Sequence, residues 1–192
     1  MARTKIDYGI DLGTTNSAIS RIENGEAVIK KTDTLKDTLP SCVYFNKRKA
    51  LQVGDTSYNT LRRDKLGAMR NWIDDSNVFI EFKRTMGTDK MYSSSNLGKD
   101  LSSEDLSAEV LKTLKSFVTD ENISAAVITV PAAFGNNQKE ATREAAKLAG
   151  FNHIELLQEP VAAAMAYGLD SKKKDGFWLV YDFGGGTFDR SE

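Results

Sequence analysis

Two short segments, one near each end of the chain, share a pattern that could bind phosphate. Residues 10–15 read IDLGTT and residues 181–187 read YDFGGGT, so each has an aspartate, an apolar residue, glycine and then threonine at the end of a strand-like run. A glycine turn lets backbone N–H groups approach an anion closely, because no Cβ blocks the way, and threonine hydroxyls add further donors. The pattern therefore predicts two turns that cradle phosphate.

The aspartates of these two segments, Asp11 and Asp182, indicate a cation at the same site. Two carboxylates that faced a phosphate would repel it unless a divalent cation lay between the acids and the ligand. Mg²⁺ gives up its hydration shell reluctantly, so we expect both acids to act through water. Each turn taken alone is equally well interpreted as a hairpin whose aspartate is satisfied locally, and the repetition favours the phosphate site.

Charge and composition exclude several classes of function. The 192 residues are 40% hydrophobic and 28% charged, with 26 basic and 27 acidic side chains and a net charge of −1. This balance gives no electrostatic reason to expect a nucleic-acid or anionic-membrane partner. One cysteine, Cys42, and one histidine, His153, exclude an internal disulfide and a structural zinc site. A bound metal would therefore be a hard cation held by oxygen atoms.

Motifs of other nucleotide sites and of exported proteins are missing from the sequence. No segment matches G-x-x-x-x-G-K-[ST] or G-x-G-x-x-G, so the predicted phosphate site is neither a P-loop nor a Rossmann turn. Residues 1–8 read MARTKIDY, without a signal-peptide apolar run, and no apolar stretch is long enough to cross a bilayer. We therefore expect a soluble, cytoplasmic protein.

The first half of the chain is predicted to be mostly strands. Alternating or apolar runs that predict strands occupy residues 6–13, 17–23, 26–32, 41–45 and 50–53. Asn24-Gly25 is a type I′ turn signal, so the first three runs are expected to form an antiparallel meander. A helix is expected over residues 55–72, whereas the polar, serine-rich residues 91–100 are expected to form a loop.

The second half alternates between helix and strand. Ser102 and Asp105 form a capping-box pattern before an apolar helical period, and a second helix is expected from about Asn137 to Gly150. Pro160 marks the start of a third helix, in which Met165 and Tyr167 are expected to pack in or beside the core. Apolar runs that predict strands cover residues 125–130, 154–157 and 177–183. This alternation predicts an α/β fold whose parallel strands are covered by helices.

The phosphate turns resemble those of the superfamily that contains actin, sugar kinases and heat-shock ATPases. Three further segments, together with a close match over the opening residues 9–17, narrow the resemblance to the heat shock protein 70 (DnaK-type) chaperone family. The resemblance runs from residue 6 to 189. The opening residues read GIDLGTTNS, and the three further segments are VFIEFKR at 78–84, ITVPAAF at 128–134 and QEPVAAAMAYG at 158–168.

The resemblance implies an actin-like (ribonuclease H-like) α/β fold, with a mixed sheet flanked by helices and a smaller α+β insertion. Subdomain IA would comprise residues 1–40 and 105–192, including the first part of the second phosphate hairpin, and subdomain IB would comprise residues 41–104. Because the chain ends three residues after Asp189, we expect this hairpin to lack its return strand. The adenosine-binding second lobe, the peptide-binding domain and the lid are expected to lie outside this chain.

The resemblance also assigns roles to the residues of the site. Asp11 and Asp182 would flank Mg²⁺, Lys83 would reach the γ-phosphate of ATP, and Glu159 would lie near the metal and the attacking water. Asp182 and Thr187 are further catalytic candidates. The phosphate-binding set implied by the family is Gly13, Thr14, Thr15 and Asn16 on one side and Gly184, Gly185, Gly186 and Thr187 on the other. Without the family pattern, Lys83 would be interpreted as a surface lysine and Glu159 as an acid favoured by a helix N-terminus.

By this resemblance, the parent protein would be an ATP-hydrolysing molecular chaperone that uses ATP/ADP and Mg²⁺. Its partners would be unfolded peptides, a J-domain co-chaperone and a nucleotide exchange factor, and the chain alone would be weakly active or inactive. Three residues depart from the family pattern and put interdomain coupling and partner docking in doubt: Ala133, Lys139 and Glu155.

Two other functions remain open from the sequence. A phosphotransferase of the sugar- or acetate-kinase type would share both hairpins but would need a substrate acid or base that the sequence does not show. The other is an actin-like, non-enzymatic interaction module.

Overall fold

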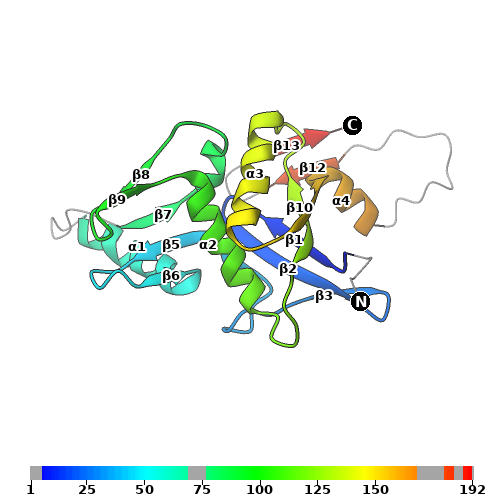
Figure 1. Cartoon of the computed structure of the whole chain (residues 1–192), viewed down its shortest axis with the longest axis horizontal. Coiled ribbons are helices and arrows are strands. Elements are labelled where there is room, and N and C mark those ends of the chain that lie inside the picture. The colour runs from blue at the N-terminus through cyan, green and yellow to red at the C-terminus, as the bar shows by residue number, and fades with distance from the viewer. Residues whose placement is uncertain (1–5, 69–76, 168–179, 184–187, 192) are drawn as a thin grey trace.

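The chain folds around a mixed β-sheet next to a group of smaller antiparallel sheets (Figure 1). The computed structural model describes residues 6–68, 77–167, 180–183 and 188–191. Helix and strand alternate in the second half as the sequence predicts, which confirms the α/β class. Among the helices of these residues, none is long and apolar enough to span a bilayer.

The main sheet has the strand order β11-β10-β1-β2-β3, and the short strand β4 pairs with β2. Strands β1, β10 and β11 run parallel, whereas β2 pairs antiparallel with β1, β3 and β4. The strands span Tyr8–Leu12 (β1), Asn16–Glu23 (β2), Glu26–Ile29 (β3), Leu39–Pro40 (β4), Ala125–Val130 (β10) and His153–Gln158 (β11). Asn24 and Gly25 between β2 and β3 both have positive φ, as the predicted type I′ turn requires.

The core lies between this sheet and two helices, α2 (Ser103–Ser116) and α3 (Asn136–Leu148), which pack against each other. Alternation along β1 sends Tyr8, Ile10 and Leu12 into the core and leaves Asp11 exposed on the opposite face. The predicted capping box is confirmed at the start of α2, where Ser102 and Asp105 exchange side chain-to-backbone hydrogen bonds.

Helix α4 (Glu159–Ala166) follows directly from β11 and has Pro160 in its first turn, as predicted. Met165 is 68% exposed and Tyr167 is 87% exposed, so the expectation that they pack in or beside the core is wrong. The predicted end of this helix at Gly168 lies outside the described residues.

Residues between β4 and α2 build two small antiparallel sheets. One has the order β6-β5-β7 and packs against α1, and the other is the hairpin β8-β9. The elements are β5 (Cys42–Phe45), β6 (Leu51–Val53), α1 (Asp55–Ala68), β7 (Val78–Ile80), β8 (Tyr92–Ser94) and β9 (Lys99–Leu101). The last residues of the predicted helix at 55–72 lie outside the described residues.

The β8-β9 hairpin corrects the prediction of a loop at residues 91–100. This hairpin is held by polar groups, so its sequence lacks an apolar alternation. The Asn77 side chain accepts hydrogen bonds from the Ser94 hydroxyl at 2.8 Å and from the Asn96 backbone at 3.0 Å, while Gly98 takes a positive φ in the turn.

The second phosphate hairpin also differs from expectation. Strand β12 (Val180–Phe183) pairs antiparallel with β13 (Phe188–Ser191), and Asp182 lies opposite Asp189. The expected lack of a return strand is therefore wrong, because the four residues 188–191 are enough to form the ladder. The turn between these strands, Gly184 to Thr187, lies outside the described residues.

Candidate functional site

The first predicted phosphate turn connects β1 to β2 and is very tight. A Cβ on Gly13 would lie 2.0 Å from the backbone oxygen of Asn16, a distance that no side chain could occupy. Glycine is therefore required at this position for steric reasons. Thr14 and Thr15 follow in the turn, and Asn16 begins β2.

Two buried serines contact this turn, and the sequence analysis assigned a role to neither. The Gly13 N–H donates to the Ser17 hydroxyl at 3.1 Å, and the Ser41 hydroxyl donates to the Gly13 carbonyl at 2.7 Å. The Ser41 N–H also donates to the Thr15 carbonyl at 2.8 Å. Ser41 lies 28 positions from Gly13 in sequence, so no local pattern could have revealed the contact.

Asp11 is exposed, and a neighbouring strand orients its carboxylate. The Thr129 hydroxyl of β10 donates a hydrogen bond to Asp11 Oδ1 at 2.9 Å. Strands β1 and β10 pair in parallel with Ile10 opposite Ile128, so the residues after this pair also lie side by side. Sequence reasoning missed Thr129, although the expected parallel pairing of strands was a signal for it.

Lys83 and Glu159 form an ion pair that is largely buried. The Lys83 Nζ lies 2.7 Å from Glu159 Oε1, and the two side chains are 7% and 17% exposed. Lys83 Nζ also lies 5.7 Å from the centre of the Phe134 ring. The alternative interpretation of Lys83 as a surface lysine is therefore wrong. Removing one partner of a buried pair typically costs about 3–5 kcal/mol, because the remaining charge has lost its compensation.

Local backbone structure places both members of this pair. Lys83 lies in a short 3₁₀ helix, η1 (Phe82–Thr85), which directly follows β7 and a left-handed residue, Glu81, with φ 57°. Glu159 is the first residue of α4, where the helix dipole favours an acidic side chain. Glu159 thus both begins a helix and binds Lys83.

The second phosphate hairpin lies beside the helix that Glu159 begins. Helix α4 packs against both β12 and β13, so the backbone of Asp182 is placed near this helix. Among the described residues, no group of three His, Cys, Asp or Glu side chains forms a ready metal cluster. An exposed, hydrogen-bonded Asp11 carboxylate is nevertheless a hard oxygen donor that suits Mg²⁺ and its bound water.

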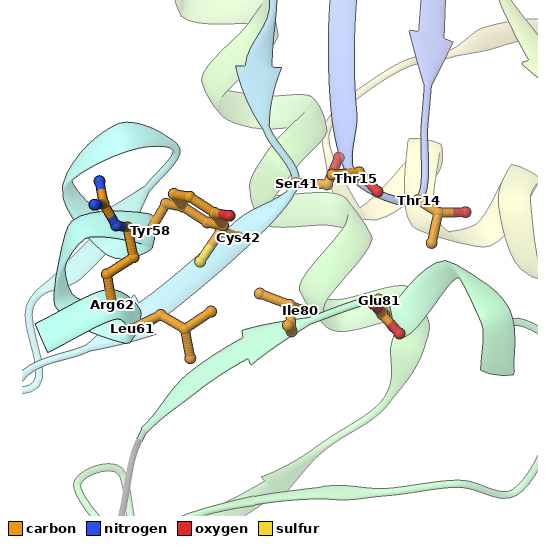
Figure 2. Close-up of a pocket in the computed structure, with 9 residues that line it drawn as sticks. All are labelled: Thr14, Thr15, Ser41, Cys42, Tyr58, Leu61, Arg62, Ile80 and Glu81. Carbon is orange, nitrogen blue, oxygen red and sulfur yellow. The ribbon is translucent and has the colours of Figure 1, made fainter. Parts of the chain in front are cut away.

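A pocket of about 290 Å³ adjoins the first phosphate turn (Figure 2). Residues from the turn, from β5, from β7 and from α1 line it: Thr14, Thr15, Ser41, Cys42, Tyr58, Leu61, Arg62, Ile80 and Glu81. Cys42 is buried, and desolvation raises the pKa of its thiol to about 12. The thiol is therefore neutral at physiological pH. Because Glu81 is two residues before Lys83, the pocket connects the turn to the segment that carries the lysine.

Comparison with known proteins decides the family. The family model described as Hsp70 protein matches residues 7–191 of this chain. The chain belongs to the Hsp70 family. It is 42% identical over 190 residues to the chaperone protein DnaK of Mycoplasmopsis pulmonis, 43% over 195 residues to that of Mycoplasma mycoides, and 41% over 190 residues to that of Mycoplasmopsis agalactiae.

These alignments cover 97%, 100% and 97% of this chain but only 29%, 30% and 29% of the three DnaK relatives. The chain thus spans about 30% of their length. It corresponds to the first lobe of the Hsp70 nucleotide-binding domain, and the mixed sheet with its smaller antiparallel sheets agrees with that assignment.

The three residues expected to depart from the family pattern are exposed or partly exposed in the structure. Ala133 is exposed, Lys139 is half-buried in α3, and Glu155 is exposed on β11, at the edge of the main sheet. The His153 ring lies 3.5 Å from the Glu155 carboxylate.

Proposed function

We propose that this chain is the phosphate-binding lobe of an ATP-hydrolysing chaperone. The observation that carries the proposal is the buried Lys83–Glu159 pair at 2.7 Å, whose lysine segment shares a pocket with the first phosphate turn. A cation held out of water would be suited to a reacting phosphoryl group, where it would offset charge that builds up in the transition state.

The proposed site has two sides. Gly13, Thr14, Thr15 and Asn16 would bind phosphate oxygens from one side, and Gly184, Gly185, Gly186 and Thr187 from the other. Asp11 and Asp182 would hold Mg²⁺ through its water molecules, and the bound ion would neutralise phosphate charge. Thr129 fixes Asp11 Oδ1 for this role.

Lys83 would exchange partners when ATP binds. Without ligand, its charge is compensated by Glu159. When the lysine turns to the γ-phosphate, the Glu159 oxygen that had bound it would become able to accept a hydrogen bond from the attacking water. Asp182 and Thr187 would act at the same phosphate. The ion pair would therefore keep the two proposed catalytic groups next to each other until ATP binding separates them.

We further propose that subdomain IA comprises residues 1–40 and 105–192, and that residues 41–104 are an inserted subdomain IB. The separate β6-β5-β7 and β8-β9 sheets support this division. In the complete protein, ATP turnover would be coupled to unfolded peptides, a J-domain co-chaperone and an exchange factor. Ala133, Lys139 and Glu155 would alter the strength of that coupling. Lys139 stands where the resemblance leads us to expect arginine, and lysine cannot reproduce the planar fork of a guanidinium.

The decisive experiment follows the γ-phosphate of labelled ATP in the full-length protein that carries this chain. Release to water, accelerated by an unfolded peptide, is the expected result. Transfer to an added sugar or to acetate would contradict the proposal and identify a phosphotransferase instead. Nucleotide binding without hydrolysis would contradict it in favour of an actin-like interaction module.

A further inference from the structure

We propose that Ser17 and Ser41 are positioning residues, which hold the first phosphate turn in its ligand-binding shape through a closed ring of hydrogen bonds on Gly13. The ring is made of three contacts: Gly13 N–H to Ser17 at 3.1 Å, Ser17 to Ser41 at 2.8 Å, and Ser41 to the Gly13 carbonyl at 2.7 Å. This inference rests on the proposed binding of nucleotide phosphates to the turn.

The direction of each hydrogen bond in the ring is fixed by the number of available protons. A serine hydroxyl has one proton to donate. Ser41 donates its proton to the Gly13 carbonyl, so Ser17 must be the donor in the contact between the two hydroxyls. The Ser17 oxygen then accepts the Gly13 N–H. The ring therefore runs in one direction and begins and ends on Gly13.

Burial makes the ring strong. Ser17 is 1% exposed and Ser41 is 3% exposed, so water cannot replace a lost partner. Each hydroxyl both donates and accepts, and such chains strengthen their members in a low-dielectric interior. Removing either hydroxyl leaves a polar group of the other, buried serine and one of the partly buried Gly13 without its partner, which is the costly way to lose a hydrogen bond.

Because peptides are planar, the hydrogen bonds of Ser41 also set the direction of the backbone N–H groups that would face phosphate. The Gly13 carbonyl and the Thr14 N–H belong to one planar trans peptide, so they point in opposite directions. By holding the Gly13 oxygen, Ser41 directs the Thr14 N–H away from itself. The Ser41 N–H also holds the Thr15 carbonyl at 2.8 Å, which directs the Asn16 N–H in the same way.

Ser41 thus binds the carbonyls of two peptides in the turn, and the N–H groups of the same two peptides point away from Ser41. Figure 2 shows Ser41 next to Thr15, with Thr14 farther along the turn. Ser41 directly precedes β5, the central strand of the β6-β5-β7 sheet. The phosphate turn is therefore attached to that small sheet as well as to β1 and β2.

The test uses four ¹⁵N-labelled variants of the 192-residue chain: Ser17→Ala, Ser41→Ala, the double variant, and Ser20→Ala as the matched control. Ser20 lies on the same strand but makes only a long contact, 3.4 Å, with the carbonyl of Gly9, outside the turn. Amide NMR titrations with Mg²⁺-ATP and with inorganic triphosphate give dissociation constants from the Thr14 and Asn16 signals, and amide hydrogen exchange reports the Gly13 N–H. Thermal melts show whether each variant is folded.

We expect each single variant to weaken binding of both ligands by about tenfold, which corresponds to the loss of one net hydrogen bond. We expect the double variant to bind no more weakly than the worse single variant, because a ring that is open at one place gains nothing from its remaining members. Gly13 exchange should accelerate in all three variants, and Ser20→Ala should behave as wild type.

Two results would contradict different parts of this account. If the single variants are folded, exchange Gly13 faster and still bind both ligands with wild-type affinity, the serines do not position the turn, while the proposed function stands. If neither ligand shifts the Thr14 and Asn16 signals of the wild-type chain, the turn does not bind phosphate, and the proposed function fails with the inference.

Discussion

At the scale of single residues, the Lys83–Glu159 pair explains how a lysine can stay charged in a buried position when no ligand is bound. Lys83 is 7% exposed, and its charge is compensated by one carboxylate at 2.7 Å. A phosphate that takes the place of this carboxylate would compensate the same charge. In the proposed function, the ion pair is therefore also the contact that the ligand would have to break.

Replacing Glu159 with glutamine should separate these two effects. The change leaves the Lys83 charge buried without its counter-charge, so we expect the chain to lose roughly 3 kcal/mol of folding free energy. Inorganic triphosphate should raise the melting temperature of Glu159→Gln more than that of the wild type, because it supplies the missing negative charge. A smaller rise in the variant would show that the ligand does not reach Lys83.

Thr129 offers a second test at this scale, with a matched pair of substitutions. Thr129→Val keeps the shape of the side chain but removes the donor to Asp11 Oδ1, whereas Thr129→Ser keeps the hydroxyl. In the full-length protein, we expect Thr129→Val to raise the Mg²⁺ concentration needed for half-maximal ATP hydrolysis by about tenfold, the value of one hydrogen bond to a charged group. Thr129→Ser should restore it, and equal behaviour of the two variants would contradict the role.

The sequence predicts the charged residues and the threonines of the candidate site, but it does not predict the hydroxyls of Ser17, Ser41 and Thr129 that hold its backbone and its aspartate. Lys83, Glu159 and Asp11 stand in patterns of several residues, so a resemblance can locate them. Ser41 and Thr129 are common polar residues whose contacts arise only when distant segments meet, as Ser41 meets Gly13, and Ser17 completes its ring only through Ser41. Side-chain hydroxyls that act through a few hydrogen bonds to distant residues leave no periodic signal in a sequence.

At the scale of elements, structures that depend on neighbouring residues were predicted more accurately than the β8-β9 hairpin, which depends on a residue outside it. The Asn24-Gly25 turn and the Ser102 capping box depend on neighbouring residues, and both were predicted correctly. The β8-β9 hairpin depends on Asn77, which lies outside it, and strand β13 depends on pairing with β12. The β8-β9 hairpin, which lacks an apolar alternation and is stabilised by Asn77, was therefore predicted as a loop.

One contact between elements gives a prediction about pH. Tyr8 of β1 donates a hydrogen bond to Glu121, and burial, followed by this hydrogen bond, raises the tyrosine pKa to about 12. In the unfolded chain the group titrates near its ordinary value of 10.0. The folded state thus keeps a proton that the unfolded state has lost, so this contribution to stability is complete below pH 10 and disappears between pH 10 and 12.

Comparing wild type with Tyr8→Phe isolates this contribution from other groups that titrate at alkaline pH. Chemical denaturation at a series of pH values should show the wild type more stable at pH 8, with the difference shrinking between pH 10 and 12. A difference that stays constant through this range would contradict the assigned shift in pKa.

At the scale of the whole molecule, the chain contains one side of a nucleotide site. We expect the 192-residue chain to bind Mg²⁺-ATP weakly, since the Hsp70 resemblance assigns the base and ribose to a second lobe that this chain does not include. The phosphate groups would also remain open to water without that lobe. Calorimetric titration checks this expectation, and a dissociation constant of about 10 μM or tighter would show that this lobe supplies most of the binding energy.

The most direct test of the central claim is the rate of ATP hydrolysis in a single turnover of the full-length protein that carries this chain. If Lys83, Asp11 and Asp182 converge on one phosphoryl group, then Lys83→Ala, Asp11→Asn and Asp182→Asn should each slow the reaction on the order of a hundredfold. The control Arg84→Ala removes the neighbouring, half-exposed cation and should leave the rate near that of the wild type. Unchanged rates in all three site variants would contradict the account.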